Sequence, residues 1–351
     1  MPDPRVISST AAAFRAWVAS GACQSESGAF VGWVDLASGR LSPDYAEITG
    51  YALTFLASQP SLADDELAVG RRAVMWLADR TRRGTLAARE GWDNGAIYLF
   101  DLAMAASGLL SFGRRLGAEE TVEAGLDLVS FLVDELVSAE LICAVSARGR
   151  PTGRRSWSTH GRAHLAKLVQ AFLLSGRLAD LDRLAGLVDM VKNLQRADGS
   201  MVTQPGEETT MLHPHLYAAE GLWIWGSATG DADALERAHA AAEWAWTHQL
   251  ETGGFPRTVS DLGRQVAPVE QCDVTAQAVR LALVLKLPSR DVGRAIARMV
   301  GLVRGSGESL AIVYQPASRD LHLNTGATFF AAQALAMALP GAPAISWREL
   351  V

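Results

Sequence analysis

The sequence predicts an all-α protein in which six outer and six inner helices close into an (α/α)6 toroid, with short β-hairpins only in the loops. Amphipathic helical stretches alternate with apolar ones along the whole chain. Successive apolar stretches begin roughly 46 to 67 residues apart, which is the length of one helical hairpin with its loop. With 351 residues, 49% of them hydrophobic, the chain can bury one large core. We therefore expect a single toroid domain over residues 1–351.

The amphipathic stretches are rich in Ala, Leu and Arg, and their one-sided apolar stripe is typical of helices that cover a core from outside. Each is followed by a polar loop that contains glycine. The predicted outer helices are Val6–Ser20, Asp64–Arg80, Glu119–Ser138, Ala179–Arg196, Asp231–Gln249 and Arg290–Arg304.

The second set of stretches is apolar on nearly all faces, which is typical of helices enclosed by others. An open solenoid of helical hairpins would show the same alternation. The all-round apolar character of these stretches favours the closed ring. Their predicted starts lie near Glu47, Asp93, His160, His215, Asp273 and Asn324.

Composition excludes several classes of protein. The net charge of -6 without a basic block argues against a nucleic-acid partner. The longest apolar runs are too short for a membrane span, and the first residues lack the pattern of a secretory signal. Three scattered cysteines, Cys23, Cys143 and Cys272, do not form a disulfide framework and fit a reducing compartment. We expect a cytoplasmic protein.

Two short segments resemble the Gln-x-x-x-Gly-Gly-Phe/Trp repeat of the prenyltransferase and squalene-cyclase toroids. They are "WTHQLETGGFP" from Trp246 to Pro256 and "NLQRADGSM" from Asn193 to Met201. The stretches "PDYAEITGYALTFL", "WDNGAIYLF" and "TFFAAQAL" resemble toroid proteins of bacterial polysaccharide synthesis and the six-hairpin glycosidase group. The resemblance implies the toroid fold over nearly the full chain and an activity on carbohydrates.

Departures from these families limit what the resemblance implies. The squalene-cyclase acid motif Asp-x-Asp-Asp is absent, since Asp64 and Asp65 fall at the start of an outer helix. Protein prenyltransferases hold zinc with Asp, Cys and His, and Cys272, Asp273 and His322 are of those types. Their order differs from the family pattern, so we expect neither metal nor cofactor.

The segment "HPHLYAAEGLW" is similar to the N-acylglucosamine epimerase group, in which histidines at inner-helix starts lie near a glutamate. Here Glu220 follows His215 by five positions instead of three. A separation of five places the two side chains on different helix faces.

In such a ring, the amino ends of the inner helices all point toward one end, beneath the long loops. Unpaired N–H groups and the positive end of each helix dipole suit an anionic or polyhydroxyl ligand there. Aromatic faces mixed with acids and imidazoles suit a sugar. The candidate catalytic residues are Glu47, Asp93, His215, Glu220 and Asp273. The candidate substrate-binding residues are Tyr51, Trp92, Tyr98, Trp157, His160, Arg162, His213, Tyr217, Glu270, His322 and Asn324.

Structural alternatives exist for most of these residues. Thr49, Asp93, Ser158, Asp273 and Asn324 are all good helix N-caps. The imidazoles of the His-Pro-His entry can be satisfied by neighbouring carbonyl groups, with the proline in the first helical turn. A buried Glu220 needs a partner in its apolar helix. The loop arginines Arg148, Arg150, Arg154 and Arg155 form either a solvated surface or an anion site above the funnel.

The sequence predicts a carbohydrate-active enzyme of surface-polysaccharide metabolism that uses general acid/base chemistry. Its partner would be a small-molecule or oligosaccharide substrate, anionic ones included, or a nucleotide- or lipid-linked sugar. Hydrolysis would use two carboxylates from Glu47, Asp93, Glu220 and Asp273. Epimerisation or elimination would use His160, His213 or His215 as proton carrier. The sequence leaves this choice open, along with an isoprenoid-handling toroid and a non-catalytic glycan-binding protein.

Overall fold

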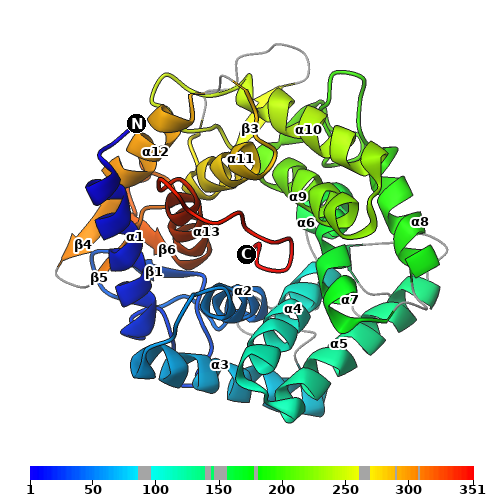
Figure 1. The fold of residues 1–351 in the computed structure, drawn as a ribbon, viewed down its shortest axis with the longest axis horizontal. Helices are drawn as coiled ribbons and strands as arrows, with labels where there is room; N and C mark the ends of the chain where they lie inside the picture. The colour runs from blue at the N-terminus through cyan, green and yellow to red at the C-terminus, as the bar shows by residue number, and fades with distance from the viewer. Residues whose placement is uncertain are drawn as a thin grey trace.

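The computed structural model describes residues 1–85, 96–138, 144–145, 156–177, 181–260, 269–288, 291–306 and 309–351. Helices form two concentric rings, and the predicted (α/α)6 toroid is confirmed (Figure 1). No helix within these ranges is long and apolar enough to cross a membrane.

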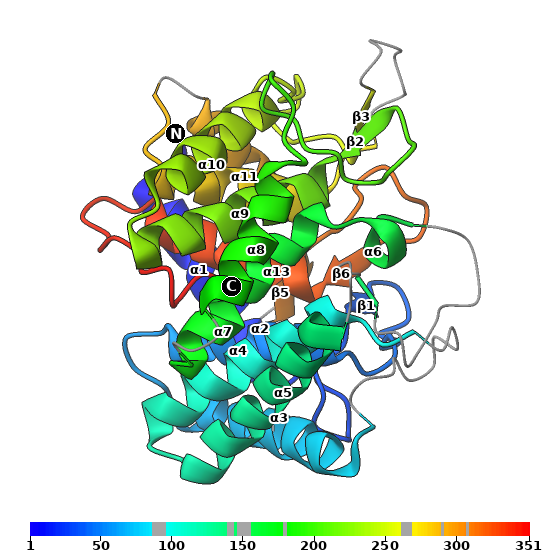
Figure 2. The ribbon, with the colours of Figure 1, turned by 90° about the vertical axis from the view of Figure 1, so that its right-hand side faces the viewer.

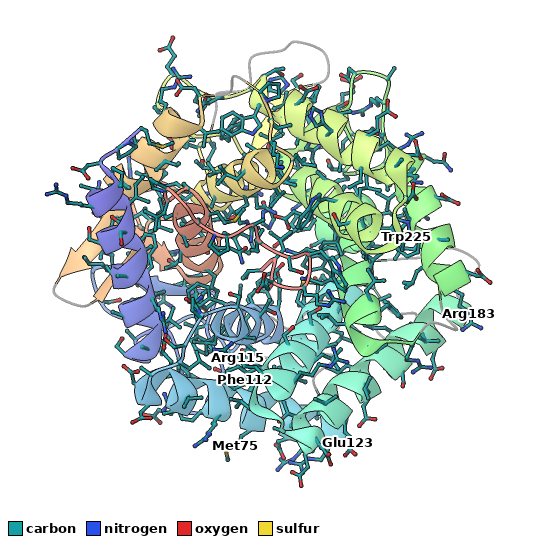
Figure 3. All side chains as sticks on the ribbon, in the orientation of Figure 1. Met75, Phe112, Arg115, Glu123, Arg183 and Trp225 are labelled. Carbon is teal, nitrogen blue, oxygen red and sulfur yellow. The ribbon has the colours of Figure 1, made fainter. Side chains whose placement is uncertain are left out.

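The outer ring follows the predicted amphipathic stretches closely. Its buried residues lie on one face of each helix, whereas residues such as Met75 and Arg183 point away from the ring (Figure 3). Phe112 lies between the rings, against Gly70 of the outer helix α3. The outer helices are α1 (Pro4–Ala19), α3 (Asp64–Arg83), α5 (Glu119–Ser138), α8 (Leu181–Lys192), α10 (Ala232–Trp246) and α12 (Val292–Gly301).

The inner ring has three starts within one residue of the predicted ones, a fourth that begins three residues earlier than His215, and two that begin later than predicted. The second inner helix begins at Leu99, downstream of Asp93, which lies outside the described residues together with Trp92. The third begins at Ala163, because the short helix α6 (Trp157–His160) ends at Gly161, where the backbone is extended. The inner helices are α2 (Ala46–Ala57), α4 (Leu99–Leu116), η1 (Ala163–Leu168) continued by α7 (Val169–Ser175), α9 (Leu212–Thr229), α11 (Cys272–Val284) and α13 (Thr325–Met337).

The ring is closed by contacts between its first and last hairpins. Helix α13 packs against both α1 and α2. Strand β1 (Trp33–Asp35) pairs antiparallel with β6 (His322–Asn324), so Trp33 lies opposite Asn324. These contacts exclude the open solenoid. The other strand pairs are β2 (Thr209–Met211) with β3 (Thr258–Ser260) and β4 (Val303–Ser306) with β5 (Ser309–Ile312).

A glutamine-glycine clamp recurs after three outer helices and explains the Gln-x-x-x-Gly pattern. In each case the glutamine Nε2 donates to the carbonyl of the glycine four residues later and to a carbonyl of another outer-helix segment. Each glycine has positive φ and packs so closely on that segment that a Cβ would clash. The clamps are Gln24 with Gly28, Gln195 with Gly199, and Gln249 with Gly253.

Glycines also bring inner helices into close contact. A Cβ on Gly108 of α4 would lie 2.3 Å from the carbonyl oxygen of Gly50 of α2. Only glycine at both positions allows this approach, which sets the distance between the amino ends of the two helices.

The two ends of the ring differ. The loops that carry β1, β2, β3, β6 and α6 lie at one end, above the amino ends of the inner helices (Figure 2). The last residues of the chain, up to Val351, lie at the centre of the ring in Figure 1. Gln170 Nε2 donates to the Leu350 carbonyl and Gln333 Nε2 to the Glu349 carbonyl. These bonds tie the last residues to the inner helices.

Candidate active site

A cavity of about 310 Å³ lies where the amino ends of the inner helices converge, and each of the six contributes side chains to it. The lining residues are Tyr45, Glu47, Ile48, Tyr51, Tyr98, Phe100, Asp101, Trp157, Ser158, His164, His213, Tyr217, Asp273, Tyr314, Asn324, Gly326, Ala327 and Phe330. The expected funnel is therefore present at the loop end of the ring.

Residues seven apart on one inner helix share its inward face and descend along the ring axis. On α9, His213 and Tyr217 line the cavity, and Glu220 lies one turn deeper, fully buried. On α11, Asp273 lines the cavity and is followed by Gln277 and Arg280, both fully buried. The site thus has an upper layer of acids and imidazoles, a floor of phenol and phenyl rings, and an ionic layer below.

Two side-chain oxygens contact the Nδ1 of His213 in the upper layer. Its Nδ1 lies 2.7 Å from Gln277 Oε1 and 3.3 Å from Asp273 Oδ2. Both oxygens can accept a hydrogen bond, so these contacts suit the tautomer that has its proton on Nδ1 and its lone pair on Nε2. Asp273 is itself held by the Val274 N–H at 2.8 Å and by a hydrogen bond with Tyr314. These contacts fix the orientation of the His213 ring.

His164 is a second imidazole at the cavity, and burial keeps it neutral. Its ring lies edge-on to Trp157, at 5.2 Å, and 5.5 Å from Phe100. Burial lowers its pKa to about 3, with the nearby His213 adding to the effect. Nδ1 of His164 has no hydrogen-bond partner among the described residues.

Glu47 and Asp101 occupy the first turns of α2 and α4, where the positive end of a helix dipole stabilises a carboxylate. The floor beneath them includes Tyr51 and Tyr217, whose hydroxyl oxygens are 2.8 Å apart. Burial, followed by the Glu47 charge, raises the pKa of Tyr51. Burial likewise raises the pKa of Tyr217, so both phenols stay protonated.

Glu220 does not face the cavity and instead joins two cations below the floor. Its Oε2 lies 2.7 Å from Lys167 Nζ and its Oε1 lies 2.5 Å from Arg280 Nη2. Lys167 Nζ in turn lies 5.0 Å from the ring centre of Tyr217. Burial is the main cause that lowers the pKa of Lys167 to about 8. The expectation of Glu220 as an acid at the substrate is thus replaced by its structural alternative, a buried ion pair.

His215 also lies away from the cavity. It comes two residues after His213, which rotates its side chain by about 200° around the helix. Its Nδ1 accepts from the Met201 N–H at 3.2 Å, and its Nε2 donates to the Ala241 carbonyl at 2.8 Å. Burial lowers the pKa of His215 to about 4. This histidine joins α9 to α10 instead of meeting a ligand.

The remaining expected residues divide between the cavity and other places. Glu270 is held by Arg298 through two bonds of 2.7 and 2.8 Å and does not line the cavity. His160 bonds Thr159 at the end of α6, and Arg162 precedes η1; neither lines it. Asn324 lines the cavity and also caps α13 by accepting from the Ala327 N–H.

Several lining residues were not anticipated from the sequence, above all Asp101, His164 and Tyr314. Asp101 sits in "LFDLAM" and His164 in "RAHLAKL", where a lone polar residue interrupts an apolar run. A polar residue that interrupts an apolar run in this way is the sequence signal that could have identified both residues. Arg148, Arg150, Arg154 and Arg155 lie outside the described residues.

Within the described ranges, no three His, Cys, Asp or Glu side chains gather as a metal site requires. Of the residues matching the prenyltransferase zinc ligands, Cys272 is fully buried, and burial raises its thiol pKa. His322 stacks on Trp33 instead, with ring centres 4.1 Å apart.

Solved structures of this architecture cover nearly the whole chain. A sugar epimerase from a ruminal bacterium superposes with a TM-score of 0.73 at 12% identity, over 95% of this chain and 99% of its own. An unsaturated glucuronyl hydrolase from Bacillus sp. GL1 gives 0.71 at 14%, over 97% and 98%. The cellobiose 2-epimerase of Bacillus thermoamylovorans gives 0.67 at 11%, over 93% and 99%. No family model and no curated protein matches the chain.

Proposed function

We propose that this protein is a carbohydrate-active enzyme that transfers a proton at a sugar carbon, as an epimerase or isomerase does, with His213 as the base. The hydrogen-bonded arrangement of His213 carries this proposal. Its Nδ1 is committed to Gln277 and Asp273, so Nε2 is the atom left to take a proton. A neutral imidazole suits this role near pH 7.

The proposed reaction is epimerisation of an open-chain aldose. Nε2 of His213 would remove the proton on the carbon next to the aldehyde, giving an enediolate and an imidazolium. After the enediolate turns its other face to His213, the same imidazolium would return the proton there and give the epimer. The protonated phenols of Tyr51 and Tyr217 and the neutral His164 are groups that can hydrogen-bond a developing oxyanion. Likeness to the folds of two sugar epimerases supports the substrate class.

Glycoside hydrolysis is the second candidate, and the three carboxylates at the cavity favour it. Glu47, Asp101 and Asp273 include the acid and base that hydrolysis needs. Likeness to the fold of a glucuronyl hydrolase also supports it. The same carboxylates and imidazoles count against a pocket for an isoprenoid chain.

Proton NMR of sugars incubated with the enzyme in D2O tests both candidates. The panel is glucose, mannose, cellobiose, lactose and an anionic unsaturated glucuronyl disaccharide. Epimerisation predicts deuterium at the carbon next to the aldehyde and a new epimer, both lost in His213→Asn. The control is His239→Asn, a change at a solvent-exposed histidine of α10.

Other outcomes of this experiment decide against the first candidate. Two sugars released from a disaccharide without deuterium at carbon, and lost in Asp101→Asn, would establish hydrolysis. Sugars that bind by calorimetry but stay unchanged would indicate a glycan-binding protein. No binding by any sugar would overturn the proposal.

A further inference from the structure

A second cavity, of about 420 Å³, adjoins the candidate active site along β1 and β6. The two cavities share Tyr45, Ile48, Tyr314 and Asn324. We call the second one the β1–β6 cavity. Its remaining lining residues are Gly32, Trp33, Gln315, Ser318, Asp320 and His322. Because four residues line both, the two cavities lie side by side.

Strand pairing fixes the wall of the β1–β6 cavity. In the antiparallel register Trp33 lies opposite Asn324 and Asp35 opposite His322, which places these side chains on one face of the ribbon. The Trp33 and His322 rings stack with an angle of 6° between their planes. Arg40 lies 5.2 Å from the Trp33 ring centre, and Asp35 lies 3.7 Å from the His322 Nε2. The wall is therefore formed before any ligand binds.

The chemistry of this wall matches a sugar residue. The phenol rings of Tyr45 and Tyr314 supply flat apolar surfaces for the C–H faces of a pyranose, and the stacked Trp33 and His322 rings border them. Side chains of Asp320, His322 and Gln315 supply donors and acceptors for hydroxyl groups. An apolar ligand would leave these polar groups without partners.

We propose that the β1–β6 cavity is a second saccharide-binding subsite, so that the preferred substrate has at least two sugar residues. The reacting residue occupies the cavity beside His213, its neighbour lies against Trp33 and His322, and the linkage passes between Tyr45, Tyr314 and Asn324. This inference rests on the proposed function, because it extends the same cleft.

Calorimetric titration with glucose, cellobiose and cellotriose, alongside mannose with mannobiose and galactose with lactose, tests the subsite. For the sugar series that binds, the disaccharide is expected to bind about tenfold more tightly than its monosaccharide. His322→Ala and Asp320→Ala are expected to remove most of that difference while leaving monosaccharide affinity within about twofold. The matched control, His239→Ala on α10, is expected to retain it.

Four other results would overturn the proposed subsite. Equal affinities for monosaccharide and disaccharide in the wild type would overturn the subsite and leave the proposed function intact. A disaccharide preference that survives both cavity variants would place the second sugar elsewhere and also overturn it. Monosaccharide binding lost in His322→Ala would assign His322 to the reacting sugar instead. Failure of every sugar to bind the wild type would overturn the proposed function and this inference together.

Discussion

Lys167 Nζ and Glu220 Oε2 lie 2.7 Å apart beneath the floor of the cavity, and neither side chain is exposed to solvent. Arg280 bonds the other oxygen of the same carboxylate, and the backbone oxygen of Val351 accepts from both cations. One carboxylate thus holds two buried cations at the ring axis. The floor of the candidate site rests on this ionic layer.

Glu220→Gln is expected to destabilise the fold by about 3–5 kcal/mol, because it removes the side-chain negative charge that contacts two buried cations. Urea denaturation monitored by circular dichroism measures the change. The control is Asp79→Asn, which breaks the exposed pair with Arg83 and should cost about 1 kcal/mol or less. Equal effects of the two variants would contradict the buried ionic layer.

His215 makes stability depend on pH. Its pKa is about 4 in the folded chain and 6.5 in the unfolded chain, so between these values the unfolded chain binds the extra proton. Stability is therefore complete above pH 6.5 and falls by about 3 kcal/mol as the pH drops to 4. His215→Gln should lower the slope of the stability profile between pH 6.5 and 4 by the contribution of one proton, while buried His164 keeps its own contribution. Urea denaturation at several pH values measures the change. An unchanged slope would show that His215 is not buried as described.

Gly108→Ala is expected to lower both thermal stability and activity, since a Cβ would meet the Gly50 carbonyl and push α4 away from α2. Gly186→Ala on the outer helix α8 is the matched control, where a Cβ meets nothing within 4 Å. That change should raise stability by about 0.5–1 kcal/mol. Differential scanning calorimetry measures both, and a harmless Gly108→Ala would refute the close helix contact.

Gln277 is expected to position His213. Gln277→Leu should lower kcat about tenfold with little change in KM, because one hydrogen bond to the base is lost. Gln277→Glu keeps an acceptor oxygen at that place and should recover most of the rate. Steady-state kinetics on the sugar identified by NMR measure both variants. A change confined to KM would assign Gln277 to substrate binding.

The ring could be predicted because each helix carries its own periodicity. The outer helices have one-sided stripes, the inner ones are apolar all round, and this difference needs no tertiary information. The helix starts near Glu47, Asp273 and Asn324 could be predicted because a capping or acidic residue marks each of them.

The candidate site was harder to predict because it depends on where each inner helix begins. Placing the second start near Asp93 put Asp101 two turns down the helix, whereas the helix starting at Leu99 brings Asp101 to the cavity. Because α6 ends before Gly161 and the inner helix begins after it, His164 lies at the cavity and His160 does not. Local propensity does not fix these starts, because tertiary packing overrides it.

We expect the converging amino ends of the inner helices to hold a sugar beside His213. A crystal structure of the His213→Asn variant, soaked with the saccharide identified by NMR, tests it most directly. We expect one sugar ring bordered by Glu47, Asp101 and Asp273. A sugar bound instead in the cavity between α1, α2 and α13 that Arg15 and Phe55 line would contradict it.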